Sequence, residues 1–126
     1  DFISHKVDDV DILSKINFVY DDAMASATVA INAKAEGDLV ISGSKGYIYV
    51  PAPWWKTEFF ELRFEDVNLN RKYFYKFEGE GLRYEIVEFL TCIRKNSESF
   101  LMSHQDMIEE VRVLDKFVSN TDVTVI

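Results

Sequence analysis

The most unusual stretch of the sequence is a proline- and tryptophan-rich segment, Pro51-Ala52-Pro53-Trp54-Trp55-Lys56, that follows a predicted strand. Prolines stiffen a loop, so the side chains that it presents lose little conformational freedom on binding a ligand. Indole rings stack on sugar or aromatic faces, and Lys56 can bind an anionic group. We therefore take Trp54, Trp55 and Lys56 as candidate substrate-binding residues. The alternative is a hairpin loop that folds back over the core. Adjacent strand residues face opposite sides, so we expect one tryptophan in the core and the other facing solvent, a ligand or a partner.

Two glycine-containing segments resemble phosphate-binding motifs but depart from them. The segment Gly79-Glu80-Gly81-Leu82-Arg83-Tyr84 follows a strand and opens a helix, as a dinucleotide-binding fingerprint does. However, Tyr84 replaces the third glycine, and Glu80 puts negative charge where a pyrophosphate would bind. The segment Gly43-Ser44-Lys45-Gly46 lacks the spacing of a P-loop and leads into a strand. We interpret the first segment as a glycine hinge and the second as a hairpin turn whose glycines supply positive φ.

Metal binding and side-chain catalysis find little support in the sequence. His5 and His104 are far apart, and neither has a cysteine or histidine partner at ligand spacing, so no metal site is predicted. Cys92 lies beside an apolar helix face and is expected to be a small buried hydrophobe, although a Cys/His pair stays open. Acidic pairs such as Glu85/Glu88 match the two carboxylates of glycosidases, but an acidic chain produces such pairs freely on its surface. We assign no catalytic residue.

Composition bounds the class of protein. The chain has 126 residues, a net charge of −8, 48% hydrophobic residues and 14% aromatic residues. These values exclude a disordered chain and fit one globular domain with a sizeable core. The negative charge argues against nucleic acid and an anionic membrane as partners, and no apolar stretch approaches the ~20 residues of a membrane helix. The single cysteine excludes an internal disulfide.

Hydrophobic periodicity predicts strands first and helices afterwards. Alternating or short apolar runs predict strands at residues 2–7, 12–20, 23–33, 39–41, 47–50, 60–64 and 73–77. From Leu82 the spacing changes to that of one helix face, and a capping-box-like Ser103-His104-Gln105-Asp106 begins a second helix. Residues 122–126 are β-prone and short, and could either pair at a sheet edge or fray. This order predicts an α+β fold: a mostly antiparallel open sheet with C-terminal helices packed on one face.

The beginning of the chain carries no start or targeting signal. It opens at Asp1, without an initiator Met, a basic segment or an apolar segment. Both a mature secreted protein and a piece of a longer protein would look like this. We expect a piece of a longer protein, because of the family that the chain resembles.

Several short motifs together resemble the C-terminal domain of Gfo/Idh/MocA-type NAD(P)-dependent oxidoreductases. The resemblance covers residues 10–120 and rests on the order and spacing of Asp22-Ala23-Met24-Ala25, the run from Gly37 to Ile48, Val50-Pro51-Ala52-Pro53-Trp54-Trp55, Gly81-Leu82-Arg83-Tyr84-Glu85 with Phe89 and Ile93, and Glu98-Ser99. It implies a two-domain cytoplasmic enzyme that transfers hydride between a sugar, cyclitol or related alcohol and NAD or NADP. An N-terminal Rossmann domain, absent from this chain, would bind the cofactor and carry the catalytic residues.

The resemblance also implies what this chain contributes. Residues 1–126 would form a single domain for substrate binding and oligomerisation, with no cofactor, no metal and no activity of its own. Its partners would be its own Rossmann domain, a small-molecule substrate and further copies of the chain, joined through the sheet face. Trp54 and Trp55 match an aromatic position that approaches the substrate in some relatives. Gly81, Tyr84 and Glu85 match the family's helix start, where packing and ligand roles are both open.

Two other functions stay open. The first is a stand-alone module that binds a small carbohydrate-like ligand, with Trp54 and Trp55 at its site. The second is a small hydrolase or isomerase in a cone-shaped α+β fold, for which the sequence offers no convincing acid/base pair. The codons upstream of Asp1 would separate these functions, because a strand–GxGxxG–helix there would identify the oxidoreductase.

Overall fold

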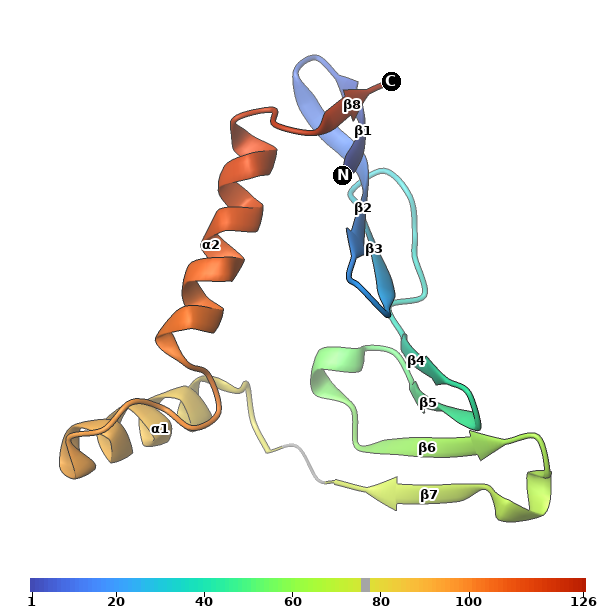
Figure 1. The fold of residues 1–126 in the computed structure, drawn as a ribbon, viewed down its shortest axis with the longest axis vertical. Helices are drawn as coiled ribbons and strands as arrows, with labels where there is room; N and C mark the ends of the chain where they lie inside the picture. The colour runs from blue at the N-terminus through green and yellow to red at the C-terminus, as the bar shows by residue number, and fades with distance from the viewer. Residues whose placement is uncertain (76–77) are drawn as a thin grey trace. The chain divides into compact units, whose positions relative to one another are not determined.

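The computed structural model describes residues 1–75 and 78–126 (Figure 1). The expected end of the last predicted hairpin strand, at Phe77, lies outside the described residues. The chain divides into two compact units: Asp1–Ala35 with Phe89–Ile126, and Glu36–Glu88. Among the described residues are eight strands and two α-helices.

The first unit contains a four-stranded sheet in the order β3–β2–β1–β8. Its strands are β1 (Phe2–Val7), β2 (Val10–Val19), β3 (Met24–Ala30) and β8 (Val123–Val125). β1, β2 and β3 pair antiparallel, whereas β8 pairs parallel with β1 at the sheet edge, which is one of the two outcomes that the β-prone C-terminus left open. Asp8 and Asp9 both have positive φ, 50° and 61°, and form the tight turn between β1 and β2.

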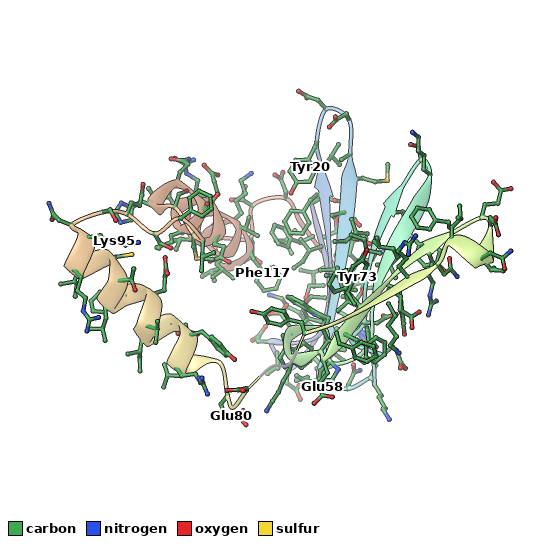
Figure 2. The ribbon with its side chains drawn as sticks, turned by 90° about the horizontal axis from the view of Figure 1, so that it is seen from below. Tyr20, Glu58, Tyr73, Glu80, Lys95 and Phe117 are labelled. Atoms are coloured by element: carbon green, nitrogen blue, oxygen red, sulfur yellow. The ribbon has the colours of Figure 1, made fainter. Side chains whose placement is uncertain are left out.

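The buried part of the first unit is small. Phe2 on β1 is only 5% exposed, and its ring packs against Phe117 of α2 (His104–Val118) with the centroids 5.3 Å apart (Phe117 is labelled in Figure 2). Ser4 shares the face of Phe2 and is fully buried. Its hydroxyl donates to the Asp11 carboxylate and lies 3.3 Å from the hydroxyl of Ser14, so this buried polar group is satisfied. Among the described residues Phe2 is the one buried hydrophobic side chain, which is less of a core than the composition led us to expect.

Two helices follow the strands. α1 (Leu82–Lys95) begins in the second unit and ends in the first, where Asn96 terminates it with φ 48°. α2 (His104–Val118) begins with the predicted capping box. The Ser103 hydroxyl accepts from the Asp106 N–H at 3.1 Å, and the Asp106 carboxylate accepts from the Ser103 N–H at 3.0 Å.

The second unit contains an antiparallel sheet whose strands follow one another in chain order. They are β4 (Leu39–Gly43), β5 (Gly46–Val50), β6 (Phe59–Phe64) and β7 (Arg71–Phe74). The register places apolar side chains on one face, and none of these strand residues is buried. We call this the apolar sheet face: Leu39, Ile41, Ile48, Val50, Phe60, Leu62, Phe64 and Tyr73. Arg71 lies at the edge of the same face, because it pairs with Leu62.

The opposite face of this sheet alternates charges with aromatic rings. Glu61 pairs with Arg63 at 2.7 Å and with Lys72 at 3.5 Å. The Arg63 guanidinium lies 4.3 Å from the centroid of the Tyr49 ring, and the Lys72 ammonium lies 3.4 Å from that of Phe59. The charged groups of this face are therefore already in contact with rings and opposite charges on the same face.

The α+β class and the open, mostly antiparallel arrangement are confirmed, with the strands divided between two sheets and α2 meeting the first through Phe117. One expectation is wrong: Gly43 and Gly46 do not adopt positive φ, which occurs at Gly37, Gly79 and Gly81. The assignment of residues 1–126 to one domain stays a prediction. Neither helix in the described part of the chain has the length and apolar character needed to cross a membrane.

Candidate functional site

The tryptophan loop, residues 51–58, joins β5 to β6. After a cis Ala52–Pro53 peptide bond it forms a short 3₁₀ helix, Trp54–Lys56. The Trp54 N–H donates to the carbonyl of Gly37 at 2.9 Å. Gly37 has φ +72°, a conformation that favours glycine. The segment just before β4 thus anchors the loop through its backbone.

The loop forms one wall of a cavity of about 510 Å³ that lies wholly within the second unit. Its aromatic lining comes from Trp55, Tyr75 and Tyr84. Its charged lining comes from Lys56, Glu80 and Glu85, with Gly81 beside them (Glu80 is labelled in Figure 2). We call this the aromatic cavity. It combines apolar ring faces with a few polar groups, which is the usual make-up of a small-ligand site.

Three local structures position the other walls of the aromatic cavity. The Tyr75 N–H donates to the Glu58 carbonyl at 2.8 Å, which continues the pairing of β7 with β6. Gly79 and Gly81 have φ values of 73° and 81° and turn the chain into α1, so the predicted glycine hinge is confirmed. The Tyr84 hydroxyl accepts from the Glu78 N–H at 3.1 Å, which holds the ring in place across this turn.

The charges in the aromatic cavity are unbalanced. The Lys56 Nζ lies 2.8 Å from the Glu80 Oε1, and the hydrogen bond and positive charge of Lys56 lower the pKa of Glu80. Glu85, in the first turn of α1, forms no ion pair with another described residue. Among the described residues that line it, two carboxylates therefore face one ammonium group that is already paired.

The structure brings only some of the predicted site residues together. Trp55 and Lys56 line the aromatic cavity, whereas Trp54 packs edge-on against Trp55, with ring centroids 6.1 Å apart. The tryptophans are 50% and 63% exposed, so the expectation that one lies in the core is wrong. Tyr75 and Glu80 were missed as site residues. Glu80 was considered only as a charge that opposes pyrophosphate, and nothing in the spacing pairs it with Lys56.

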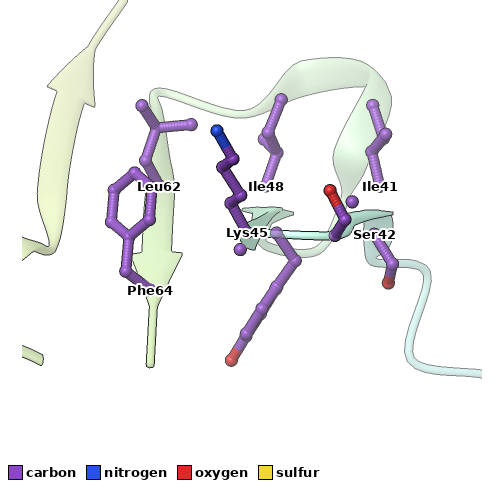
Figure 3. A pocket seen from close by; sticks show the side chains of 10 residues that line it. Ile41, Ser42, Lys45, Ile48, Leu62 and Phe64 are labelled. Atoms are coloured by element: carbon purple, nitrogen blue, oxygen red, sulfur yellow. The ribbon is translucent and has the colours of Figure 1, made fainter. Parts of the chain in front are cut away.

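A second hollow of about 400 Å³ lies over the β4–β5 hairpin and β6. Figure 3 shows Ile41, Ile48, Leu62 and Phe64 lining it, with Lys45 at the turn. It belongs to the apolar sheet face. The Gly43-Ser44-Lys45-Gly46 segment is the hairpin turn that was predicted, since Gly43 pairs directly with Gly46.

The histidine and cysteine candidates lie outside these hollows. His104 Nδ1 lies 2.8 Å from the Glu98 carboxylate, next to the start of α2, and Cys92 is half-buried on α1. Within residues 1–75 and 78–126, no group of three or more potential metal-ligating side chains comes together.

No protein-family model matches the chain, and no curated protein matches it significantly.

Proposed function

We propose that this chain is the substrate-binding and oligomerisation domain of a cytoplasmic NAD(P)-dependent oxidoreductase that acts on a sugar, cyclitol or related alcohol. The observation that carries the proposal is the aromatic cavity, in which Trp55 and Lys56 of the tryptophan loop meet Tyr84 and Glu85 of the helix start. Trp55, Tyr84 and Glu85 belong to the two segments whose sequence resembles the substrate domain of Gfo/Idh/MocA-type enzymes, and Lys56 directly follows the first of them.

The chemistry of the aromatic cavity suits a hydroxylated ligand. Aromatic faces pack against the C–H surface of a sugar or cyclitol ring, and Trp55, Tyr75 and Tyr84 supply three of them. Carboxylates accept hydrogen bonds from hydroxyl groups, and Glu80 and Glu85 supply those acceptors. In the proposed reaction these residues bind and orient the alcohol.

The described residues do not fit the cofactor itself. At the start of α1, Glu80 places negative charge beside the glycine turn, and the Tyr84 ring stands where the fingerprint needs a small residue. We therefore assign NAD or NADP, and the catalytic acid/base, to an N-terminal Rossmann domain outside residues 1–126.

The apolar sheet face supports the proposed self-association. It consists of eight aliphatic and aromatic side chains, and none of them is buried. Exposed apolar surfaces of this kind mark interaction sites, and identical copies commonly pair through the same surface patch. The net charge of −8 supports a partner other than nucleic acid or an anionic membrane.

A second candidate function is a stand-alone module that binds a small carbohydrate-like ligand. It is favoured by one observation: every lining residue of the aromatic cavity that the structure describes lies within the single unit Glu36–Glu88. Such a cavity needs no second domain to be complete.

The experiment that tests the proposed function compares residues 1–126 with the whole reading frame that contains them. We expect the whole protein to bind NADH in a fluorescence titration and to reduce NAD⁺ or NADP⁺ with a polyol, and residues 1–126 alone to do neither. Micromolar NADH binding by residues 1–126 would contradict the proposal. A whole protein without NADH binding but with carbohydrate binding would favour the stand-alone module.

Substitution of the tryptophans tests the role of the cavity in that enzyme. We expect Trp55→Ala to raise the KM for the polyol about tenfold, because it removes a stacking surface. Trp54→Ala is the matched control and should change KM less than about twofold. Equal effects of the two changes would contradict the assignment of Trp55 to the substrate site.

A further inference from the structure

We propose that the aromatic cavity takes a hydroxylated ligand that bears an ammonium group, in preference to its neutral counterpart, and that it rejects phosphorylated or carboxylated counterparts. This inference rests on the proposed function in one respect, namely that the aromatic cavity is the substrate site. It adds a statement about the charge of the substrate. Three features of the cavity support that statement: a paired lysine, a second carboxylate and a set of ring faces.

The lysine already has a carboxylate partner. Its Nζ lies 2.8 Å from the Glu80 Oε1, at hydrogen-bond distance. A phosphate or carboxylate that approached Lys56 would have to displace Glu80 and leave that carboxylate unpaired beside the new negative charge. The sequence had suggested Lys56 as an anion-binding residue, and this contact argues for the opposite preference.

The second carboxylate sets the sign of the cavity. Glu85 lines it and forms no ion pair with another described residue, so it faces the cavity as an unneutralised charge. The neighbouring Arg83 does not neutralise it, because Arg83 pairs with Glu78 at 3.2 Å. Among residues 1–75 and 78–126, the lining charges are thus Lys56, Glu80 and Glu85, which sum to one negative charge that attracts a cation and repels an anion.

The ring faces add to the same preference. An ammonium group within about 6 Å of an aromatic centroid is attracted to the electron-rich face, whereas a phosphate or carboxylate is not. Trp55, Tyr75 and Tyr84 supply three rings around one cavity. The Tyr84 ring already has the Arg83 guanidinium 5.2 Å from its centroid, so Trp55 and Tyr75 are the rings offered to a ligand cation. Rings together with carboxylates favour a ligand that combines an apolar ring surface, hydroxyl groups and a positive charge.

The test uses Trp55 as its own reporter. The chain has two tryptophans, so Trp54→Phe leaves Trp55 as the only one while keeping an aromatic ring beside it. Its fluorescence is titrated with glucosamine, glucose and glucose 6-phosphate at about pH 6, where an aliphatic amine is protonated. We expect glucosamine to bind about tenfold more tightly than glucose, and glucose 6-phosphate to give no saturable change.

Charge-removing variants locate the effect. Glu85→Gln should bring the affinities for glucosamine and glucose within about twofold of each other, and Glu80→Gln should allow glucose 6-phosphate to bind through the released Lys56. Glu65→Gln removes the same charge from an exposed position that does not line the aromatic cavity, and it should leave the preference unchanged. A preference for glucose or glucose 6-phosphate, an equal response to all three sugars, or no response to glucosamine would overturn the inference.

Failure of the inference and failure of the proposed function give different results. A whole protein that binds NADH and oxidises neutral polyols, but shows no preference for the amino sugar, refutes the ammonium assignment alone. A cavity that prefers glucosamine, in a whole protein that binds no NADH, refutes the oxidoreductase alone.

Discussion

Gly46 shows how a single residue can be required for a reason that its sequence context hides. A side-chain Cβ at this position would lie 2.5 Å from the carbonyl oxygen of Arg63 and 2.9 Å from the Phe64 ring. A Cβ at Gly43, at the other end of the same turn, would meet its nearest atom, the Gly46 carbonyl oxygen, at 3.4 Å. The turn itself was predictable from the two glycines, but the reason for Gly46 is the close approach of the β6 backbone and not a left-handed φ.

We therefore expect Gly46→Ala to destabilise the second sheet while Gly43→Ala is tolerated. The clash in the first variant should lower the free energy of unfolding by about 1–3 kcal/mol, the usual cost of overpacking. The second variant should stay within about 1 kcal/mol of the parent. Urea denaturation followed by tryptophan fluorescence measures both. Equal stabilities for the two variants would mean that β6 can move away from the turn.

At the candidate site the sequence predicted the residues that are unusual in type and missed those that are ordinary. Trp55 and Lys56 stood out because paired tryptophans next to prolines are rare. Glu80 did not, because its contact with Lys56 joins residues 24 positions apart and depends on the turn made by Gly79 and Gly81. No periodicity encodes such a contact.

At the level of single elements, α2 was predicted most fully because its start signal is local. The reciprocal hydrogen bonds of Ser103 and Asp106 join residues three positions apart, so the sequence contains the whole motif. The Ser103 hydroxyl and then its backbone N–H are the main causes that lower the pKa of Asp106. The cap is therefore strongest when Asp106 is ionised.

We expect Ser103→Ala to reduce helix content and to lower stability by about 1 kcal/mol at neutral pH. A carboxylate with a lowered native pKa contributes stability above its unfolded-state pKa, and this contribution is lost as the pH falls through the native pKa. The difference between Ser103→Ala and the parent should therefore shrink in acid. Far-UV circular dichroism across a pH series measures it. The control is Ser97→Ala, because the Ser97 hydroxyl bonds to no other described residue. A stability difference between Ser103→Ala and the parent that does not change with pH would contradict the role of Asp106.

Strands were predictable as elements, but their partners were not. Alternation located β1, β2, β5 and β6 closely, because it depends only on which side chains share a face. It does not say which strand lies next to which. The division into two sheets and the parallel pairing of β8 with β1 both join segments that are distant in sequence, so they depend on contacts that no local pattern records.

At the scale of the whole molecule, acidity and exposed apolar surface act in opposite directions. A net charge of −8 keeps copies apart, whereas an accessible apolar sheet face draws partners together. The composition predicts the first effect directly. The second effect depends on which apolar residues remain uncovered in the folded units. The sequence predicts only which apolar side chains share a strand face, and not whether that face is covered.

The two central residues of β4 allow self-association to be tested with a matched pair of changes. Val40 and Ile41 are 51% and 52% exposed, and as neighbours in a strand they lie on opposite faces, with Ile41 on the apolar sheet face. If copies of the protein join through that face, Ile41→Glu places a charge from each copy in the interface. Ile41→Glu should then raise the dissociation constant of self-association at least about tenfold, whereas Val40→Glu should leave it unchanged. Light scattering over a dilution series measures both. A parent protein that is monomeric at all concentrations would refute self-association through the apolar sheet face. A loss of association in Val40→Glu alone would refute it as well, because a charge should weaken the dimer only on the face that the two copies share.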